Sequence, residues 1–175
     1  MNRLSESLSA CVRKLEALHA RHDADAGVIF VQVDQMARIN NSAGTATGDS
    51  VLDEIGRRLE NFASDEFGQG SCVDRLDGPR FLIVPSTPMS LGALRAQERA
   101  LHVALAEPIV GDPNGRLSIR IAAALITRDD SVAEQLRAAC DQLARPASAR
   151  DGVMVHAALS QNEVVIHYQP QYDVA

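Results

Sequence analysis

The residues best suited to chemistry surround a predicted hairpin turn at residues 77–81, which read Asp-Gly-Pro-Arg-Phe. Two short β-prone runs flank the Asp77-Gly78 pair, and this dipeptide is typical of a tight turn because glycine accepts the positive φ that the turn requires. The turn carries one carboxylate, on Asp77, and one guanidinium, on Arg80. A guanidinium can hold a phosphate without a metal ion, whereas on an exposed turn it can equally stay a solvated side chain.

The elements that must position this turn alternate between helical and extended patterns along a chain of 175 residues. Apolar spacing of three and four residues predicts helices, and short β-prone or alternating runs predict strands. The predicted helices cover residues 2–22, 51–62, 91–105 and 131–145, with a further helical start at 36–39, and the predicted strands cover 28–33, a hairpin ending at 85, 117–126 and 153–155. The run 28–33 is apolar throughout, as in a strand buried on both faces. This order predicts an α+β fold, ferredoxin-like or polymerase-palm-like, with helices on one face of a mainly antiparallel sheet.

The predicted N-terminal helix carries one apolar stripe along its length. The stripe consists of Leu4, Leu8, Cys11, Val12, Leu15 and Leu18. One interpretation is that the helix packs on the domain that follows it. The other is that it connects to an upstream segment or forms a dimer contact, because the stripe repeats at near-heptad spacing. We treat residues 1–26 as an N-terminal linker helix, and the pattern leaves both interpretations open.

The composition argues against several function classes. The net charge is −6, and the 17 Lys and Arg residues are spread along the chain, which argues against a nucleic-acid or anionic-membrane surface. No stretch approaches membrane-spanning length. Cys11, Cys72 and Cys140 show no ligand spacing and indicate reduced thiols, so we expect a cytoplasmic location. His19 and His22 lie one helical turn apart without a second ligand pair, so we expect no metal site there.

The sequence around the turn resembles the GGDEF domain family, whose members make cyclic di-GMP from two GTP molecules. Set against the signature Gly-Gly-Asp/Glu-Glu-Phe, only Gly78 and Phe81 match, and Pro79 and Arg80 replace the two acidic positions. The ordered set that carries the resemblance is Ile39-Asn40, Gly44, Gly48-Asp49, Arg75-Leu76, Gly78 and Phe81. The resemblance covers residues 27–155, which we therefore interpret as a degenerate GGDEF domain.

The resemblance implies that the residues needed for catalysis are missing. Phosphoryl transfer needs divalent cations held by carboxylate oxygens. The family's metal carboxylates fall on Gln32 and Pro79, and Asp34 matches only the second acid of the family's Asp-x-Asp. The phosphate-binding lysine falls on Ala147, and the inhibitory product site, which would fall on residues 68–71, is absent. We therefore expect no catalytic residue, no metal and no cofactor.

The guanine contacts of the family align with Asn40 and Asp49, at the two ends of a predicted polar, glycine-bearing loop over residues 40–49. A carboxylate can accept hydrogen bonds from N1–H and the exocyclic amine of guanine together. Both residue types also cap turns and helices well. The two residues are therefore either structural caps or the remnant of a guanine pocket that binds GTP weakly.

The tail resembles the beginning of an EAL domain, the cyclic di-GMP phosphodiesterase or receptor module. A short helix is predicted over residues 156–163 and a strand over 164–169, followed by Pro170 in a Tyr-Gln-Pro sequence. An unpaired β-rich strand needs a partner sheet. We therefore interpret residues 156–175 as the truncated start of an EAL domain, in which Gln169 would be a ligand contact.

Together these features predict a catalytically inactive GGDEF-like regulatory domain that acts through contacts with an adjacent EAL cyclic di-GMP receptor domain, as in the FimX or LapD kind of composite protein. An upstream sensor domain and homodimerisation are further expected partners. The alternative is a GTP-responsive domain that activates an EAL phosphodiesterase. A third hypothesis is an active cyclase with an unusual metal site.

Overall fold

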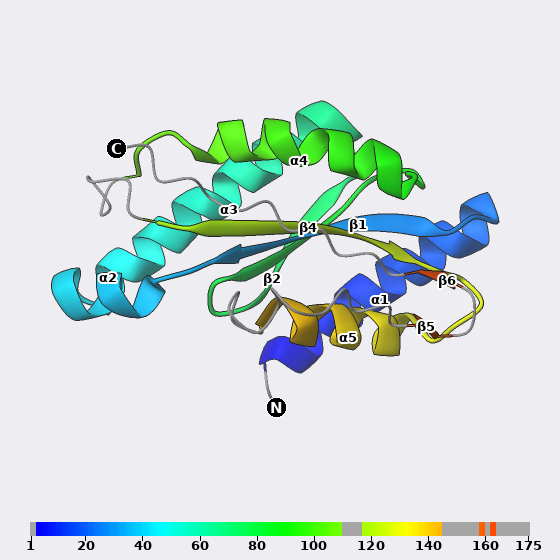
Figure 1. Ribbon diagram of the computed structural model, residues 1–175, viewed down its shortest axis with the longest axis horizontal. Helices are drawn as coiled ribbons and strands as arrows, with labels where there is room; N and C mark the ends of the chain where they lie inside the picture. The colour runs from blue at the N-terminus through cyan, green and yellow to red at the C-terminus, as the bar shows by residue number, and fades with distance from the viewer. Residues whose placement is uncertain (1–2, 110–116, 145–157, 160–161, 164–175) are drawn as a thin grey trace.

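A four-stranded antiparallel sheet forms the middle layer of the molecule (Figure 1). The structure is a computed structural model that describes residues 3–109, 117–144, 158–159 and 162–163. The strands lie in the order β2-β3-β1-β4, and each neighbouring pair is antiparallel. Their bounds are β1 Ala26–Val33, β2 Cys72–Asp77, β3 Arg80–Val84 and β4 Ile119–Ile126. The predicted α+β fold with an antiparallel sheet is confirmed.

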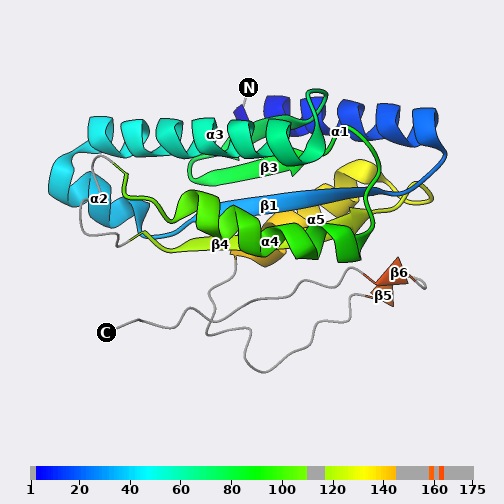
Figure 2. The ribbon, with the colours of Figure 1, turned by 90° about the horizontal axis from the view of Figure 1, so that it is seen from above.

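Helices cover both faces of this sheet, as Figures 1 and 2 show. On one face lie α2 (Met36–Ala43), α3 (Thr45–Phe67) and α4 (Leu91–Leu105), and on the other lie α1 (Arg3–His22) and α5 (Val132–Ala144). The prediction of helices on one face only was therefore wrong. The reason lies in β1, where Ile29 and Val31 belong to the core under α3 whereas Val28 and Phe30 belong to the core under α1.

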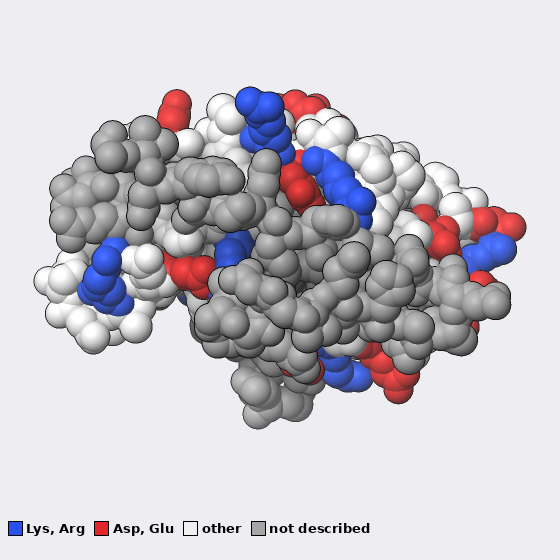
Figure 3. All heavy atoms as spheres, in the orientation of Figure 1, with Lys and Arg blue, Asp and Glu red and all other residues white. Residues whose placement is uncertain are grey.

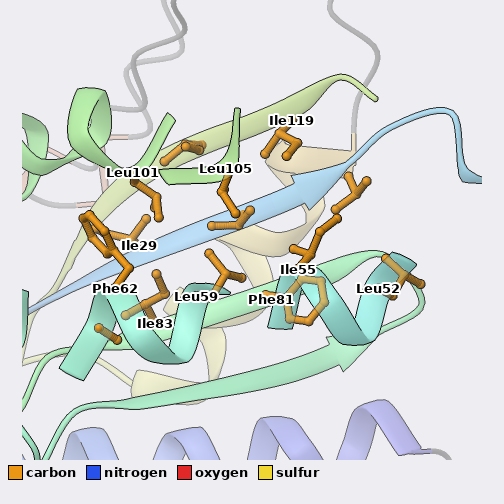
Figure 4. Packing of buried hydrophobic residues seen from close by; sticks show 14 of the residues in the cluster. Ile29, Leu52, Ile55, Leu59, Phe62, Phe81, Ile83, Leu101, Leu105 and Ile119 are labelled. Atoms are coloured by element: carbon orange, nitrogen blue, oxygen red, sulfur yellow. The ribbon is translucent and has the colours of Figure 1, made fainter. Parts of the chain in front are cut away.

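The larger core lies between the sheet and α3 (Figure 4). Ile55 and Leu59 of α3 are fully buried there. Phe81, the last residue of the predicted turn segment, points into the same core and is 3% exposed. The aromatic residue after the turn therefore anchors β3, which holds the turn at a fixed place at the end of the sheet.

The apolar stripe of α1 lies in the second core. Cys11 and Leu15 are completely buried, and Leu8 and Leu18 are less than a tenth exposed. These side chains pack with residues of the sheet and α5, including Phe30. The interpretation that this helix packs on its own domain is confirmed, because the sheet and α5 cover Leu8, Cys11, Leu15 and Leu18.

The predicted loop over residues 40–49 is helical. Helix α2 continues to Ala43, α3 begins at Thr45, and Gly44 alone separates them, with a φ of 87° that glycine readily adopts. The polar residues here do not break the helix, because Thr47 Oγ1 donates to the carbonyl oxygen of Ala43 at 2.7 Å. A polar sequence can thus lie on an exposed helix surface, which is why its composition was misleading.

The hairpin between β2 and β3 is present, with Gly78 and Pro79 as its two connecting residues. Asp77 and Arg80 are the pair that closes the ladder at the turn. Gly78 has a φ of 40°, so the positive φ expected of this glycine is confirmed.

The C-terminal part is described only in fragments. Ala158–Leu159 and Asn162–Glu163 pair as two short antiparallel strands, β5 and β6. The helix predicted over 156–163 was therefore wrong, because backbone pairing of Leu159 with Asn162 replaces helical hydrogen bonds. The predicted strands at 153–155 and 164–169, with Gln169, lie outside the described residues. Within the described part of the chain, no helix is long and apolar enough to cross a bilayer.

Candidate functional site

Three polar side chains stand in one row across the sheet. Gln32 in β1 is directly opposite Arg80 in β3 on one side and Arg120 in β4 on the other. Residues in register on neighbouring strands point to the same face of a sheet. Leu82 and Ala122, each two residues further along, belong to the core under α1 and α5, so the row faces that side. It lies at the end of β1, next to the predicted signature.

Arg80 forms an ion pair with Asp77 across the turn. Its Nε donates to Asp77 Oδ1 at 2.5 Å, and its Nη2 donates to Asp77 Oδ2. This hydrogen bonding raises the pKa of the Arg80 guanidinium. The side chain is only 22% exposed, so Arg80 is not the solvated residue that an exposed turn would give. Its Nη1 also reaches the carbonyl oxygen of Cys140 in α5, at 3.5 Å.

On the β4 side of Gln32, Arg120 forms an ion pair with Asp34. Arg120 Nε donates to Asp34 Oδ2 and Arg120 Nη2 to Asp34 Oδ1, both at 2.6 Å. Gln32 Nε2 donates to the same Oδ1 at 3.2 Å. Arg120 was not predicted from the sequence, although a charged residue between the apolar residues Ile119 and Ile121 of a strand is a signal that could have indicated it.

Gln32, in the middle of the row, carries an unsatisfied hydrogen-bond acceptor. Its Oε1 is buried and has no hydrogen-bond partner among the described residues. A buried carbonyl oxygen without a donor costs free energy, so this position is not optimised as a purely structural contact. Gln32 thus presents a neutral amide between two cations.

The backbone of the turn is tied to the strand end. Pro79 provides its carbonyl oxygen to the amide of Val33 at 2.9 Å. Arg75 Nε donates to the carbonyl oxygen of Gly78 at 2.8 Å, and Arg75 lies 3.8 Å from Asp53 of α3. The turn is therefore fixed by contacts on both sides. Pro79 contributes only its backbone carbonyl group to these contacts, because proline has no carboxylate side chain.

Asn40 and Asp49 lie on the two helices α2 and α3. Asn40 Oδ1 is buried without a partner among the described residues. It lies so close to Gly48 that a Cβ atom on Gly48 would stand 1.9 Å from it. Asp49 is exposed. The Asn40 amide therefore lies against Gly48, the residue before Asp49, and α2 and α3 are in close contact there.

The remaining predicted positions carry no ligand-binding geometry that the structure describes. Ala147 lies outside the described residues. Within 68–71, Ser71 Oγ donates to the carbonyl oxygen of Ala63 at 2.8 Å, and Gln69 Nε2 donates to Ser64 Oγ at 2.7 Å. These side chains therefore bind to the end of α3. In the described ranges no three His, Cys, Asp or Glu side chains gather as a metal ion requires.

Charged side chains are interspersed over the described part of the face drawn in Figure 3. Where residues are described, as along α4, Lys and Arg side chains stand beside Asp and Glu side chains. Such a surface does not present the clustered positive charge that phosphate-backbone binding uses.

Comparison with known proteins gives one family and a consistent set of structures. Residues 4–151 match the family model described as diguanylate cyclase, GGDEF domain. No protein of curated function matches the chain. The solved GGDEF domain of YfiN from Pseudomonas aeruginosa is 22% identical, with a TM-score of 0.62 over 77% of this chain and 84% of that one.

Two other solved structures are similar. A sensory box/GGDEF family protein from Caulobacter crescentus is 26% identical, with a TM-score of 0.54 over 79% of this chain and 85% of that one. An EAL/GGDEF domain protein from M. capsulatus is 24% identical, with a TM-score of 0.59 over 79% of this chain and 88% of that one. All three share the fold of this chain.

Proposed function

The chain belongs to the GGDEF domain family, and on that premise we propose that it is a catalytically inactive regulatory domain of a cyclic di-GMP signalling protein. Domains of this family serve in such proteins, some of which also carry an EAL domain, as the M. capsulatus protein does. The proposed domain acts through contacts with an adjacent EAL receptor domain, and residues 156–175 are the proposed start of that domain.

One observation supports inactivity above the others. The row Arg80–Gln32–Arg120 occupies the end of the sheet where the family resemblance places a metal-binding carboxylate. The two carboxylates nearby are already paired, Asp77 with Arg80 and Asp34 with Arg120. Magnesium prefers anionic oxygen ligands, and a cation entering here would meet two guanidinium groups.

The residues present do not fit the metal that the family implies. Gln32 offers one neutral amide oxygen and Pro79 offers no side-chain oxygen at all. Asp34 would have to leave two hydrogen bonds of 2.6 Å to Arg120 before it could bind a cation. We therefore derive no catalytic step through a metal ion for this chain. Its own residues stabilise the turn and the strand ends instead.

A second candidate function is a GTP-responsive domain that activates a neighbouring EAL phosphodiesterase. The observation that favours it is the pairing of Asn40, whose Oδ1 has no partner among the described residues, with the exposed Asp49 on adjacent helices. An amide and a carboxylate together suit the hydrogen-bonding edge of guanine. In this candidate GTP would bind through its base and would not be turned over.

The decisive experiment measures cyclic di-GMP formed from GTP with Mg²⁺ or Mn²⁺, on a dimerised form of the chain and beside an active member of the family. The expected result is no product above background, because each lost electrostatic contact costs a factor of about a hundred or more in rate. The double variant Gln32→Asp with Pro79→Glu is also expected to stay inactive, because Ala147 leaves the phosphates without their lysine. Clear product from the unmodified chain would overturn the proposal.

A further inference from the structure

Arg80 contacts more than its own turn. Its guanidinium reaches across to α5, where Nη1 donates to the carbonyl oxygen of Cys140. Figure 1 shows the turn between β2 and β3 beside the orange, C-terminal end of α5. The contact joins residues 60 positions apart in the sequence. It is therefore a tertiary link between the turn and the end of a helix on the α1 side of the sheet.

The end of α5 suits a cation. The C-terminal end of a helix carries partial negative charge, and carbonyl oxygens there accept hydrogen bonds from Lys or Arg side chains. Asp141, the next residue of α5, adds a negative charge that acts on Arg80 and contributes to its raised pKa. Arg80 thus lies among Asp77, Asp141 and the Cys140 carbonyl group.

The position of Arg80 is the fourth of the signature, where the family resemblance places a glutamate. A glutamate has no hydrogen to donate to the Cys140 carbonyl oxygen, and its charge would oppose both Asp141 and the helix end. The replacement by arginine therefore removes an acidic group and creates a contact that the acidic residue could not make.

We infer that Arg80 couples the turn between β2 and β3 to the C-terminal end of α5, so that a partner or ligand that recruits the Arg80 guanidinium loosens the end of α5. A carboxylate or phosphate group brought to the turn competes with the Cys140 carbonyl group for Arg80. By linkage, a change at the end of α5 alters the affinity of the turn for that anion by the same factor.

The regulatory role of this coupling rests on the proposed function. The contact between Arg80 and α5 is tested without any activity measurement. Amide hydrogen exchange of the whole chain is compared between the unmodified protein and Arg80→Gln. We expect amides of residues 139–144 to exchange about fivefold faster in the variant, because one hydrogen bond to a charged group is lost. Amides in the centre of β1 and β4 should be unchanged and act as an internal reference.

Arg75→Gln is the matched control. Arg75 is on the same hairpin, but within the described part of the chain it contacts Gly78 and Asp53 and not α5. It should leave exchange in α5 unchanged. Arg80→Lys, which keeps the charge, should give an intermediate rate. Equal exchange in α5 for Arg80→Gln and the unmodified chain, or the same acceleration in Arg75→Gln, would overturn the inference.

A charge swap separates the ion pair from the link to α5. Asp77→Arg combined with Arg80→Asp restores a pair of opposite charges across the turn but removes the donor at position 80. We expect the denaturation midpoint of this double variant to lie closer to that of the unmodified chain than the midpoint of Arg80→Gln does. The amides of α5 should still exchange fast. Recovery of both quantities would show that the pair alone protects α5, and the inference would then be wrong. Product formation from GTP is independent of each of these outcomes, so its result tests only the proposed function.

Discussion

Arg120 binds both carboxylate oxygens of Asp34, each at 2.6 Å, although 86 positions separate the two residues in the sequence. The pair lies at the end of the sheet, where Arg120 and Asp34 side chains are 16% and 28% exposed. Bidentate pairs of this kind are stronger than the usual surface ion pair and fix the geometry of both groups. In this structure the pair engages both carboxylate oxygens of Asp34.

Replacing Asp34 with Asn should destabilise the fold by about 1–3 kcal/mol, because the bidentate ion pair between Asp34 and Arg120 would be lost. A double-mutant cycle with Arg120→Met, read from urea denaturation, should give a coupling free energy of about 1–2 kcal/mol. Asp53→Asn is the control, since that carboxylate is 79% exposed and 3.8 Å from its arginine. Its midpoint should not change. A coupling near zero for the Asp34 pair would contradict the importance given to it here.

Gly48 and Gly56 should respond oppositely to alanine. A Cβ on Gly48 would stand 1.9 Å from Asn40 Oδ1, whereas one on Gly56 would make an ordinary contact of 3.5 Å with Phe81. Gly48→Ala should therefore lower the free energy of unfolding by about 1–3 kcal/mol, and Gly56→Ala should raise it by about 0.5–1 kcal/mol, since alanine is the better helix former. Chemical denaturation measures both. Equal effects would mean that α2 and α3 can separate easily.

GTP, where it binds, should bind weakly and with the same affinity in the presence and absence of Mg²⁺. In the proposed alignment the base meets Asn40 and Asp49, whereas the positions of the family's metal carboxylates fall on Gln32 and Pro79. Isothermal titration with and without Mg²⁺ tests this, with Asp49→Ala expected to abolish the heat of binding. Asp53→Ala, one turn further along α3, should leave it unchanged. Tight binding that requires Mg²⁺ would contradict the reading of this site.

Stability should fall at alkaline pH through a buried thiol. Burial raises the pKa of Cys140 to about 11, above the value of about 9 for an unfolded thiol. The folded state thus keeps the neutral thiol, and the stability that this provides is complete below pH 9 and is lost as the pH rises toward 11. We expect a loss of about 1–2 kcal/mol over that range. Urea midpoints for Cys140→Ala should fall less over the same range; an identical slope would show that Cys140 ionises freely in the fold.

The sequence was informative where a pattern is local and misleading where it depends on a distant partner. The apolar run at 28–33 predicted a strand buried on both faces, and β1 is such a strand. A strand buried on both faces needs helices on both sides of the sheet. The predicted order of elements nevertheless indicated helices on one face only. Gly44 could not be recognised as the single residue between two helices, because its polar neighbours have side-chain hydrogen bonds that only the folded chain reveals.

The candidate site was predicted in part. The replacement of the signature's acids by Gln32, Pro79 and Arg80 stays a prediction from the resemblance to the family. The contacts that Asp34 and Arg80 make could not be predicted from the sequence. The partner of Asp34 is on β4, and a second contact of Arg80 is on α5. Both contacts depend on strand register and on the helix layer. No local pattern around residue 34 or residue 80 encodes them.

The burial of α1 limits how far this helix can move relative to the rest of the domain. Cys11 and Leu15 have no exposed surface, and Leu8 and Leu18 have very little. Each such side chain contributes about 1.5–3 kcal/mol when buried, so detaching this helix would cost a large part of the stability of a typical domain. Helix α1 therefore moves together with the sheet and α5 unless the core that they share opens.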